Sequence, residues 1–528
     1  MTASHPTPCG IFTGKRGDLV TQYLGIKYAN LQDQLSTPEM ITDYGTDPID
    51  ATKIGPRAPA MNGCAFEQDI LIQCNIGAPP SPPMSGMDCL SLNITVPDFR
   101  SHTPLPVMVF IHGGGFIMGA NYWPQYDPAH LVKMSVEIDS PVIFVSINYR
   151  LGVLGNLTSE ELRKAGYPGN NSLRDQRCAL RWVKKHIEGF GGDASNVTAF
   201  GESAGAVAVM HHLSSTQPLF KRAISMSGTP FMLKPLSTEV TAKSYDAIVA
   251  KLGLGKMSSA DRIQHLITLA PDELVEKTPM TVPLTPYLDN DFVTTMPTLS
   301  GLANDPQFPT WCEELLIGSC QHDGNVFFFI GLASRSANIA SALSTSLRAH
   351  LPESAAAEVL ETYGITLLTP DDEAMTKVLQ LGTDIAYALP ASSYARAFPG
   401  RTWRYTFDQE NPWKGMFEGR ATHMLDAAFL FQKFNHQLDD GGNQVAEGLA
   451  KDFIGFANGK GASWGQYMGG DVYGQAKVSR SYGSCDGEGE RGITDAEEQE
   501  HGLLKLSEEK KADLDALGRA WDLFVAGK

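Results

Sequence analysis

The chain lacks several features that mark particular classes of protein. None of its 528 residues belongs to an uninterrupted apolar stretch of about 18 residues, so no transmembrane helix is expected. The first residues do not form the basic segment and apolar run of a secretory signal. No Cys-x-x-Cys pair occurs among the eight cysteines, which argues against the common zinc and thioredoxin-type motifs. We therefore expect a globular protein without a bound metal.

Positive charge is also scarce. Lysine and arginine together number 42, against 59 aspartates and glutamates, and the formal net charge is −17. A nucleic-acid-binding protein needs a basic face to neutralise phosphates, and no run rich in lysine or arginine is present. The sequence therefore predicts no nucleic-acid partner, and we interpret the acidity as a solvated surface.

Apolar residues are plentiful and are grouped in short runs. Hydrophobic residues make up 42% of the chain and charged residues 19%, which suits a large core. Such runs, separated by helical stretches, predict a buried parallel sheet covered on both faces. No break in composition requires a second domain, so we expect a single domain over residues 1–528, with 61–86 and 231–311 as insertions on the sheet. The runs are 106–111, 141–148, 196–200, 222–226 and 315–317.

The pentapeptide GESAG at 201–205 has the pattern G-x-S-x-G. It follows the apolar run 196–200 and precedes the helix-like segment 206–213. A sharp turn from a strand into a helix needs flanking glycines, because the backbone is crowded there, and it lifts the serine hydroxyl clear of the sheet. This context predicts that Ser203 is a nucleophile.

A second glycine-rich loop, HGGGF at 112–116, follows the run 106–111. Consecutive glycines allow backbone N–H groups to turn inward and meet an oxyanion without clashes from a Cβ atom. We predict that the N–H groups of Gly114 and Gly115, joined by that of Ala204, form an oxyanion hole. His112 is interpreted as structural.

With these motifs in place, the chain resembles the type-B carboxylesterase and lipase family, which includes the cholinesterases, and in particular a fungal-type intracellular member. Matching segments such as YLGIKYA, NYRLGVLGNL and THMLDAAFLF extend from about residue 10 to residue 467. The resemblance implies an α/β-hydrolase fold, with a mostly parallel central sheet, helices on both faces and long insertions over the active site. It also implies hydrolysis of carboxylic esters of small molecules, with no cofactor.

The resemblance further implies a catalytic acid and base. The acid position falls on Asp323, where most relatives carry glutamate, and the base position falls on His423. Rival acids are Glu313 and Glu314, which precede the run 315–317, and Asp426, which follows the histidine by one helical turn and looks like a supporting residue.

The chain departs from the family in its cysteines. Ala58 stands where secreted relatives have the first cysteine of a disulfide, so Cys89 could pair only with Cys64 or Cys74. The region of the second family disulfide has no cysteine. Together with the missing signal, this pattern predicts a cytoplasmic location.

Two alternatives remain open for the function. The same residues could transfer an acyl group to an alcohol, or open a lactone or a thioester of a secondary-metabolite intermediate. A non-catalytic scaffold on the same fold would be expected to lose the serine or the histidine. Phe116, Phe231 and Phe327 adjoin the catalytic segments and are candidates for an apolar substrate pocket. The oligomeric state of the protein does not follow from the sequence.

Overall fold

The computed structural model describes residues 2–98, 101–279, 281–289, 291–467, 479–483, 503, 506 and 512–527. Within these residues the centre is a 12-stranded sheet in the order β1-β2-β3-β7-β9-β8-β10-β11-β12-β13-β14, with β6 beside β2, and β4 pairs with β5 separately. The strands are β1 Thr2–Thr7, β2 Gly10–Arg16, β3 Val20–Lys27, β4 Ala29–Asn30, β5 Glu39–Met40, β6 Ile49–Asp50, β7 Ser91–Pro97, β8 Leu105–Ile111, β9 Ile143–Ile147, β10 Gly192–Glu202, β11 Arg222–Met226, β12 Glu314–Cys320, β13 Arg401–Phe407 and β14 Ser479–Tyr482.

Strand direction divides this sheet into two parts. From β9 through β8 to β14 every neighbouring pair is parallel. The pairs from β1 through β2, β3 and β7 to β9 are antiparallel. The predicted parallel strands are confirmed, although several are longer than the apolar runs that indicated them. The antiparallel strands at the amino-terminal end were not predicted, because β1 has the polar sequence TASHPT and one half-exposed side.

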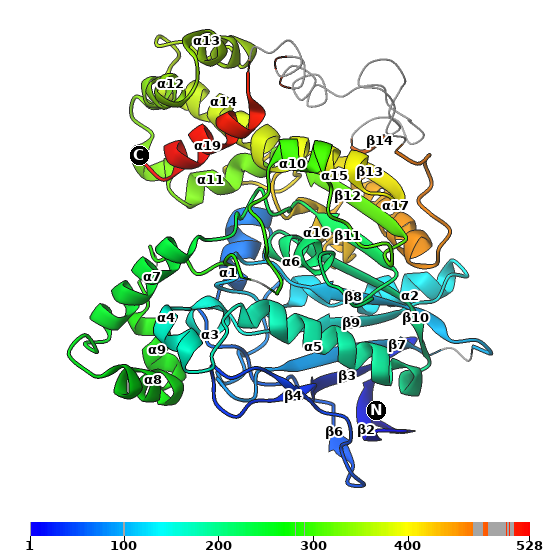
Figure 1. Cartoon of the computed structure of the whole chain (residues 1–528). Helices are drawn as coiled ribbons and strands as arrows, with labels where there is room; N and C mark the ends of the chain where they lie inside the picture. Colours follow the sequence, from blue (N-terminus) through cyan, green and yellow to red (C-terminus); the bar gives the residue numbers. More distant parts are fainter. Residues whose placement is uncertain are drawn as a thin grey trace.

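Helices cover both faces of the sheet (Figure 1). The helices are α1 Cys64–Phe66, α2 Ala129–Glu137, α3 Gly152–Asn156, α4 Glu160–Lys164, α5 Asn171–His186, α6 Ala204–His212, α7 Thr238–Lys251, α8 Ser259–Thr268, α9 Pro271–Lys277, α10 Leu299–Asn304, α11 Val326–Phe329, α12 Ile339–His350, α13 Glu353–Thr362, α14 Asp371–Thr383, α15 Leu389–Ala397, α16 Leu425–Leu430, α17 Asp440–Ala457 and α19 Leu514–Val525.

The central parallel strands carry apolar residues on both of their sides, because both faces of the sheet are covered there. In β8, Val107 and Val109 belong to the cluster that contains α5 and α6, whereas Met108 and Phe110 belong to the cluster that contains α16 and α17. Successive strand residues point to opposite faces, so a strand covered on both sides has no polar alternation. The expected mostly parallel sheet with helices on both faces is thereby confirmed.

The two predicted insertions differ in character. Residues 231–311 form α7, α8, α9 and α10 and contain no strand within the part that the structure describes. The first three of these helices lie together at the left of Figure 1, where they share a small apolar cluster with α3 and α4. Residues 61–86 carry α1 and a π-helical segment, Glu67–Ile72, that packs near α16. A single domain over residues 1–528 stays a prediction, since it extends beyond the described ranges.

No helix in the described ranges has the length and apolar character needed to cross a membrane.

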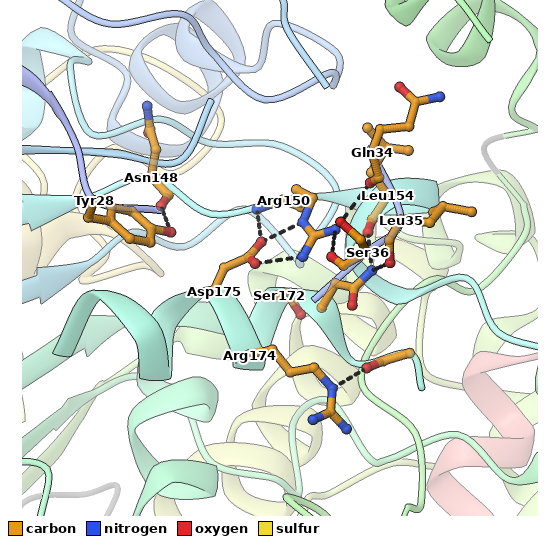
Figure 2. A network of polar contacts seen from close by, with 12 residues as sticks. Tyr28, Gln34, Leu35, Ser36, Asn148, Arg150, Leu154, Ser172, Arg174 and Asp175 are labelled. Carbon is orange, nitrogen blue, oxygen red and sulfur yellow. Dashed lines mark hydrogen bonds and ion pairs between the residues drawn. The ribbon is translucent and has the colours of Figure 1, made fainter. Parts of the chain in front are cut away.

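A buried ion pair ties the loop after β9 to helix α5. Arg150 Nε and Nη2 donate to the two carboxylate oxygens of Asp175 at 2.8 Å and 2.7 Å, and both side chains are fully buried. Arg150 Nη1 also donates to the backbone oxygens of Gln34 and Ser36 (Figure 2). Every charged oxygen and most guanidinium hydrogens are therefore paired, which is the condition under which a buried charge is tolerated.

Replacing Asp175 by asparagine is expected to lower the free energy of unfolding by about 3–5 kcal/mol, because it leaves the Arg150 charge buried without its counter-charge. The measurement is the urea midpoint of the purified protein. The matched control is Asp98→Asn, which removes the exposed partner of Arg16 and should cost less than about 1 kcal/mol. An equal loss of unfolding free energy in the two variants would show that the buried ion pair contributes no more to stability than the exposed one.

Candidate active site

Three loops with predicted functions meet at one edge of the sheet. β8 ends at Ile111 before the HGGGF loop, β10 ends at Glu202 before Ser203, and β12 ends at Cys320 shortly before Asp323. These strands are parallel, so their carboxyl ends lie on the same side, where open α/β sheets bind their ligands.

Ser203 lies in the turn between β10 and α6. Its backbone has φ +55° and ψ −125°, a conformation that is sparsely populated by residues with a side chain. The flanking glycines are required by space: a Cβ on Gly201 would overlap the backbone of Gly205, and a Cβ on Gly205 would overlap the carbonyl oxygen of Ile111. The strain therefore falls on the one residue whose hydroxyl the turn presents at the edge of the sheet.

The structure brings the serine, histidine and aspartate together. Ser203 Oγ lies 2.9 Å from His423 Nε2, and His423 Nδ1 lies 2.8 Å from Asp323 Oδ1. Asp323 Oδ2 accepts a hydrogen bond from the backbone N–H of Cys320, and the backbone N–H of His423 donates to Asn325 Oδ1. A hydroxyl, an imidazole and a carboxylate in this order form the arrangement that activates a serine as a nucleophile.

The rival acids are placed elsewhere. Glu314, at the amino end of β12, pairs with Arg222 and Arg401. Glu313 precedes that strand and is half exposed. Asp426 Oδ2 accepts a hydrogen bond from the Tyr405 hydroxyl at 2.8 Å, and burial together with the nearby Asp323 carboxylate raises the pKa of Asp426 to about 6. Among these carboxylates only Asp323 contacts the imidazole of His423 at Nδ1.

The glycine loop has the backbone shape expected of an oxyanion hole. Gly114 and Gly115 have φ values of +95° and +63°, and a Cβ on Gly114 would overlap the carbonyl oxygen of Met118. Among the described residues, no backbone carbonyl accepts a hydrogen bond from the N–H of Gly114, Gly115 or Ala204. Three donors without partners, next to the serine hydroxyl, suit a developing negative charge.

His112 supports this loop. Its ring stacks on Tyr149 at 4.4 Å, and the Tyr149 hydroxyl donates to the His112 carbonyl oxygen. Burial lowers the pKa of His112 to about 4, so the ring is uncharged at neutral pH. These contacts agree with the expectation that His112 has a structural role.

The predicted pocket phenylalanines occupy three different environments. Phe116 is fully buried, with its ring edge-on to Tyr149, so in this structure it belongs to the core and does not face an accessible cleft. Phe231 packs on Tyr394, with 6.2 Å between the ring centroids, and Phe327 packs on Trp521 at 5.1 Å. A contact of Phe231 or Phe327 with substrate stays a prediction.

Two buried glutamates near His423 were not singled out from the sequence. Glu202 is fully buried, its Oε1 lies 3.2 Å from His423 Nε2, and neither of its oxygens has a hydrogen-bond partner among the described residues. Burial, with smaller effects of Asp426, Glu67 and Asp323, raises the pKa of Glu202 well above its usual range. Glu202 therefore favours its protonated form, which can donate a hydrogen bond but adds no negative charge beside the imidazole.

Glu67 is the second of these glutamates and comes from the insertion at 61–86. It accepts hydrogen bonds from the Tyr126 hydroxyl at 2.6 Å and from Gln125 Nε2 at 2.9 Å. Burial raises the pKa of Glu67 from 4.5 to about 7. The sequence offered no signal for this residue, since an isolated glutamate in an irregular segment usually lies in solvent.

Glu67 makes stability depend on pH. Since its folded pKa is raised, the folded chain holds more protons than the unfolded chain between pH 4.5 and about 7, and stability falls as pH rises through this window. The loss should reach roughly 3 kcal/mol above the folded pKa. We expect Glu67→Gln to be more stable than the parent at pH 8 and to lose this advantage at pH 4.

Urea midpoints of variant and parent at both pH values test this expectation. The exposed Glu447→Gln on α17 is the control and should show no pH-dependent difference from the parent. A Glu67→Gln profile parallel to that of the parent would contradict the expectation.

Within the described ranges, no three His, Cys, Asp or Glu side chains form a group that could hold a metal ion.

Comparisons with known proteins identify the family of the chain. The model of the carboxylesterase family matches residues 2–460. Lipase 3 of Yarrowia lipolytica (strain CLIB 122 / E 150) is 29% identical over 447 residues, which cover 80% of this chain and 82% of that protein. The inactive carboxylesterase-like protein VdtD of Byssochlamys spectabilis is 36% identical over 283 residues, which cover 52% of this chain and 47% of that protein.

A solved structure extends the likeness to the whole fold. A PNB esterase superposes with a TM-score of 0.70 and 26% identity, over 91% of this chain and 96% of that one. The family match spans most of the sequence, and the neighbour shares the α/β-hydrolase fold. This chain therefore belongs to the carboxylesterase family and is a serine-type carboxylic ester hydrolase.

Proposed function

We propose that the chain cleaves carboxylic esters of small molecules through an acyl-enzyme on Ser203. The observation that carries the proposal is the continuous chain of contacts from Ser203 Oγ through His423 to Asp323. His423 Nε2 takes the hydroxyl proton while Ser203 Oγ attacks the ester carbonyl, and Asp323 stabilises the imidazolium that forms.

The oxyanion of the tetrahedral intermediate is held by the N–H groups of Gly114, Gly115 and Ala204. His423 then gives its proton to the departing alcohol oxygen, and the acyl group stays on Ser203 as an ester. A water molecule that loses a proton to His423 attacks this ester and releases the acid. Each donor of such an oxyanion hole typically contributes about 2.7–4 kcal/mol to the transition state.

The scaffold alternative is addressed by labelling of the serine. One relative carries the word inactive in its name, so presence in the family does not by itself establish catalysis. In this chain the serine, the histidine and the aspartate are all present and in contact. We expect a fluorophosphonate probe to add one phosphonyl group at Ser203, measured by peptide mass spectrometry, and to add none after denaturation in urea. Absence of labelling on the folded protein would favour the scaffold.

Acyl transfer and the opening of lactones or thioesters share these residues and differ in substrate. Incubation of a short 4-nitrophenyl ester with a competing alcohol separates hydrolysis from transfer. We expect the free acid as the main product, and a transesterified product in excess of the acid would identify an acyltransferase. A screen over short esters, long esters, lactones and thioesters then identifies the class of substrate.

We also propose a reducing, cytoplasmic location. The described cysteines, including Cys64, Cys74 and Cys89, are free and buried, so the disulfide left open for Cys89 does not form in this structure. Burial raises the pKa of Cys64 and of Cys74 to about 11, which keeps both as thiols. Free thiols in this number are typical of reducing compartments.

A further inference from the structure

A cavity lies at the carboxyl end of α6, whereas the nucleophile Ser203 lies at the start of this helix. Its volume is about 330 Å³, within the range of small-molecule sites. The residues that line it include none of Ser203, His423 and Asp323, and none of the predicted oxyanion donors. Its walls come from α6, the segment 292–298, α10 with the residues that follow it, and α15. It is therefore a separate volume from the candidate active site.

Three aromatic residues lie on the cavity wall. Phe308 and Tyr394 face each other edge to face with 5.9 Å between centroids, and Phe292 lines the same space. Rings in this arrangement offer edges and faces on which an aromatic ligand can stack. The far side of Tyr394 packs on Phe231, so the ring of Tyr394 is held from behind.

Two polar side chains on this wall have polar atoms without a hydrogen-bond partner among the described residues. His211 and Tyr394 are 6% and 7% exposed, and both line the cavity. Among the described residues, His211 Nε2 is buried without a hydrogen bond, and the Tyr394 hydroxyl, which keeps some accessible surface, makes none. Polar groups in folded proteins are nearly always hydrogen-bonded, to the protein or to water, so this wall keeps polar groups with which a bound molecule can pair.

The charges on the wall restrict the kind of ligand. Burial lowers the pKa of His211 to about 4 and raises that of Tyr394, so at neutral pH the imidazole is uncharged and the hydroxyl keeps its proton. Among the described residues that line the cavity there is one carboxylate, Asp305, and no lysine or arginine. An anion would find no counter-charge here, whereas an uncharged ligand loses little on entering.

We propose that this cavity is a second ligand-binding site for an uncharged aromatic compound that carries a hydroxyl group. The ring packs against Phe308 and Tyr394, and the hydroxyl pairs with His211 and the Tyr394 oxygen. The proposal is independent of the chemistry at Ser203.

The test uses 2-naphthol as the probe and the full chain with Ser203 blocked by a phosphonate, so that the active site does not bind it. A fluorescence titration at pH 7 should show saturable binding of one equivalent. Tyr394→Phe removes only the hydroxyl and should weaken binding about threefold to tenfold, as the loss of one neutral hydrogen bond does. His211→Leu should weaken it by a similar factor.

Leu302→Trp, on α10 at the cavity wall, should fill the space and weaken binding more than tenfold. The matched control is Leu252→Trp, which makes the same change at the end of α7, outside the cavity, and should bind like the parent. The proposal is overturned if the blocked parent shows no saturable binding, or if Leu302→Trp binds the probe as tightly as the parent. If His211→Leu fails to fold, Tyr394→Phe and Leu302→Trp decide the question.

Discussion

Ser203→Ala is expected to lower kcat for a 4-nitrophenyl ester by about 10⁶, the size of loss seen when a serine hydrolase loses its nucleophile. Ser203 Oγ is the atom 2.9 Å from His423 Nε2, and no other described hydroxyl contacts that nitrogen. The unpaired N–H groups of the glycine loop remain in the variant, so weak residual hydrolysis above the rate in water is expected. The measurement is the release of 4-nitrophenolate under saturating substrate.

The control for this variant is Ser214→Ala, at an exposed position just after α6. It makes the same chemical change on the same side of the sheet and should keep the activity of the parent. Turnover by Ser203→Ala within tenfold of the parent would refute the assignment of the nucleophile. Loss of activity in both variants would indicate a folding defect, which the urea midpoint detects.

Asp323→Asn is expected to lower kcat by about 10⁴. The backbone N–H of Cys320 donates to Asp323 Oδ2, so in the variant the amide oxygen is the atom suited to that place. The amide NH₂ then faces His423 Nδ1 and donates to it, which places the ring proton on Nε2. In that tautomer Nε2 has no lone pair to accept the proton of Ser203, and the nucleophile is not activated.

Asp426→Asn is the matched control for the acid. Asp426 is also buried and follows His423 closely in sequence, but its oxygens are engaged by the Tyr405 hydroxyl and the N–H of Ala427. Its replacement should cost at most about tenfold in kcat, since it touches neither nitrogen of the imidazole. A larger loss of kcat for Asp426→Asn than for Asp323→Asn would identify Asp426 as the acid of the triad.

The nucleophile turn and the glycine loop were predictable from the sequence because each is marked by glycines at neighbouring positions of the chain. Gly201 and Gly205 are needed by neighbours in the same turn or on the strand beside it, and Gly114 and Gly115 by the backbone shape of their own loop. The central parallel strands were predictable because a strand that is buried on both faces contains a short run of consecutive apolar residues.

The acid and the base needed more than local chemistry. Asp323 and His423 are one hundred residues apart in the chain, and only the family resemblance pointed to them. The structure adds the reason that Asp323 is favoured over Glu313 and Glu314: the carboxyl end of β12 lies at the same edge of the sheet as that of β10, with only β11 between them. Glu314, at the opposite end of β12, is used for an ion pair with Arg222.

The sequence by itself determined the fold class, the turn that presents Ser203 and the loop that suits an oxyanion, because each is marked by short patterns of residues adjacent in the chain. Only the tertiary structure decided that Glu67 and Glu202 are buried near His423, that Phe116 belongs to the core, and that His211 lines a second cavity. The physical reason is that burial, the pairing of charges and the shape of a cavity arise from segments far apart in sequence. No local pattern of residues records which of them meet.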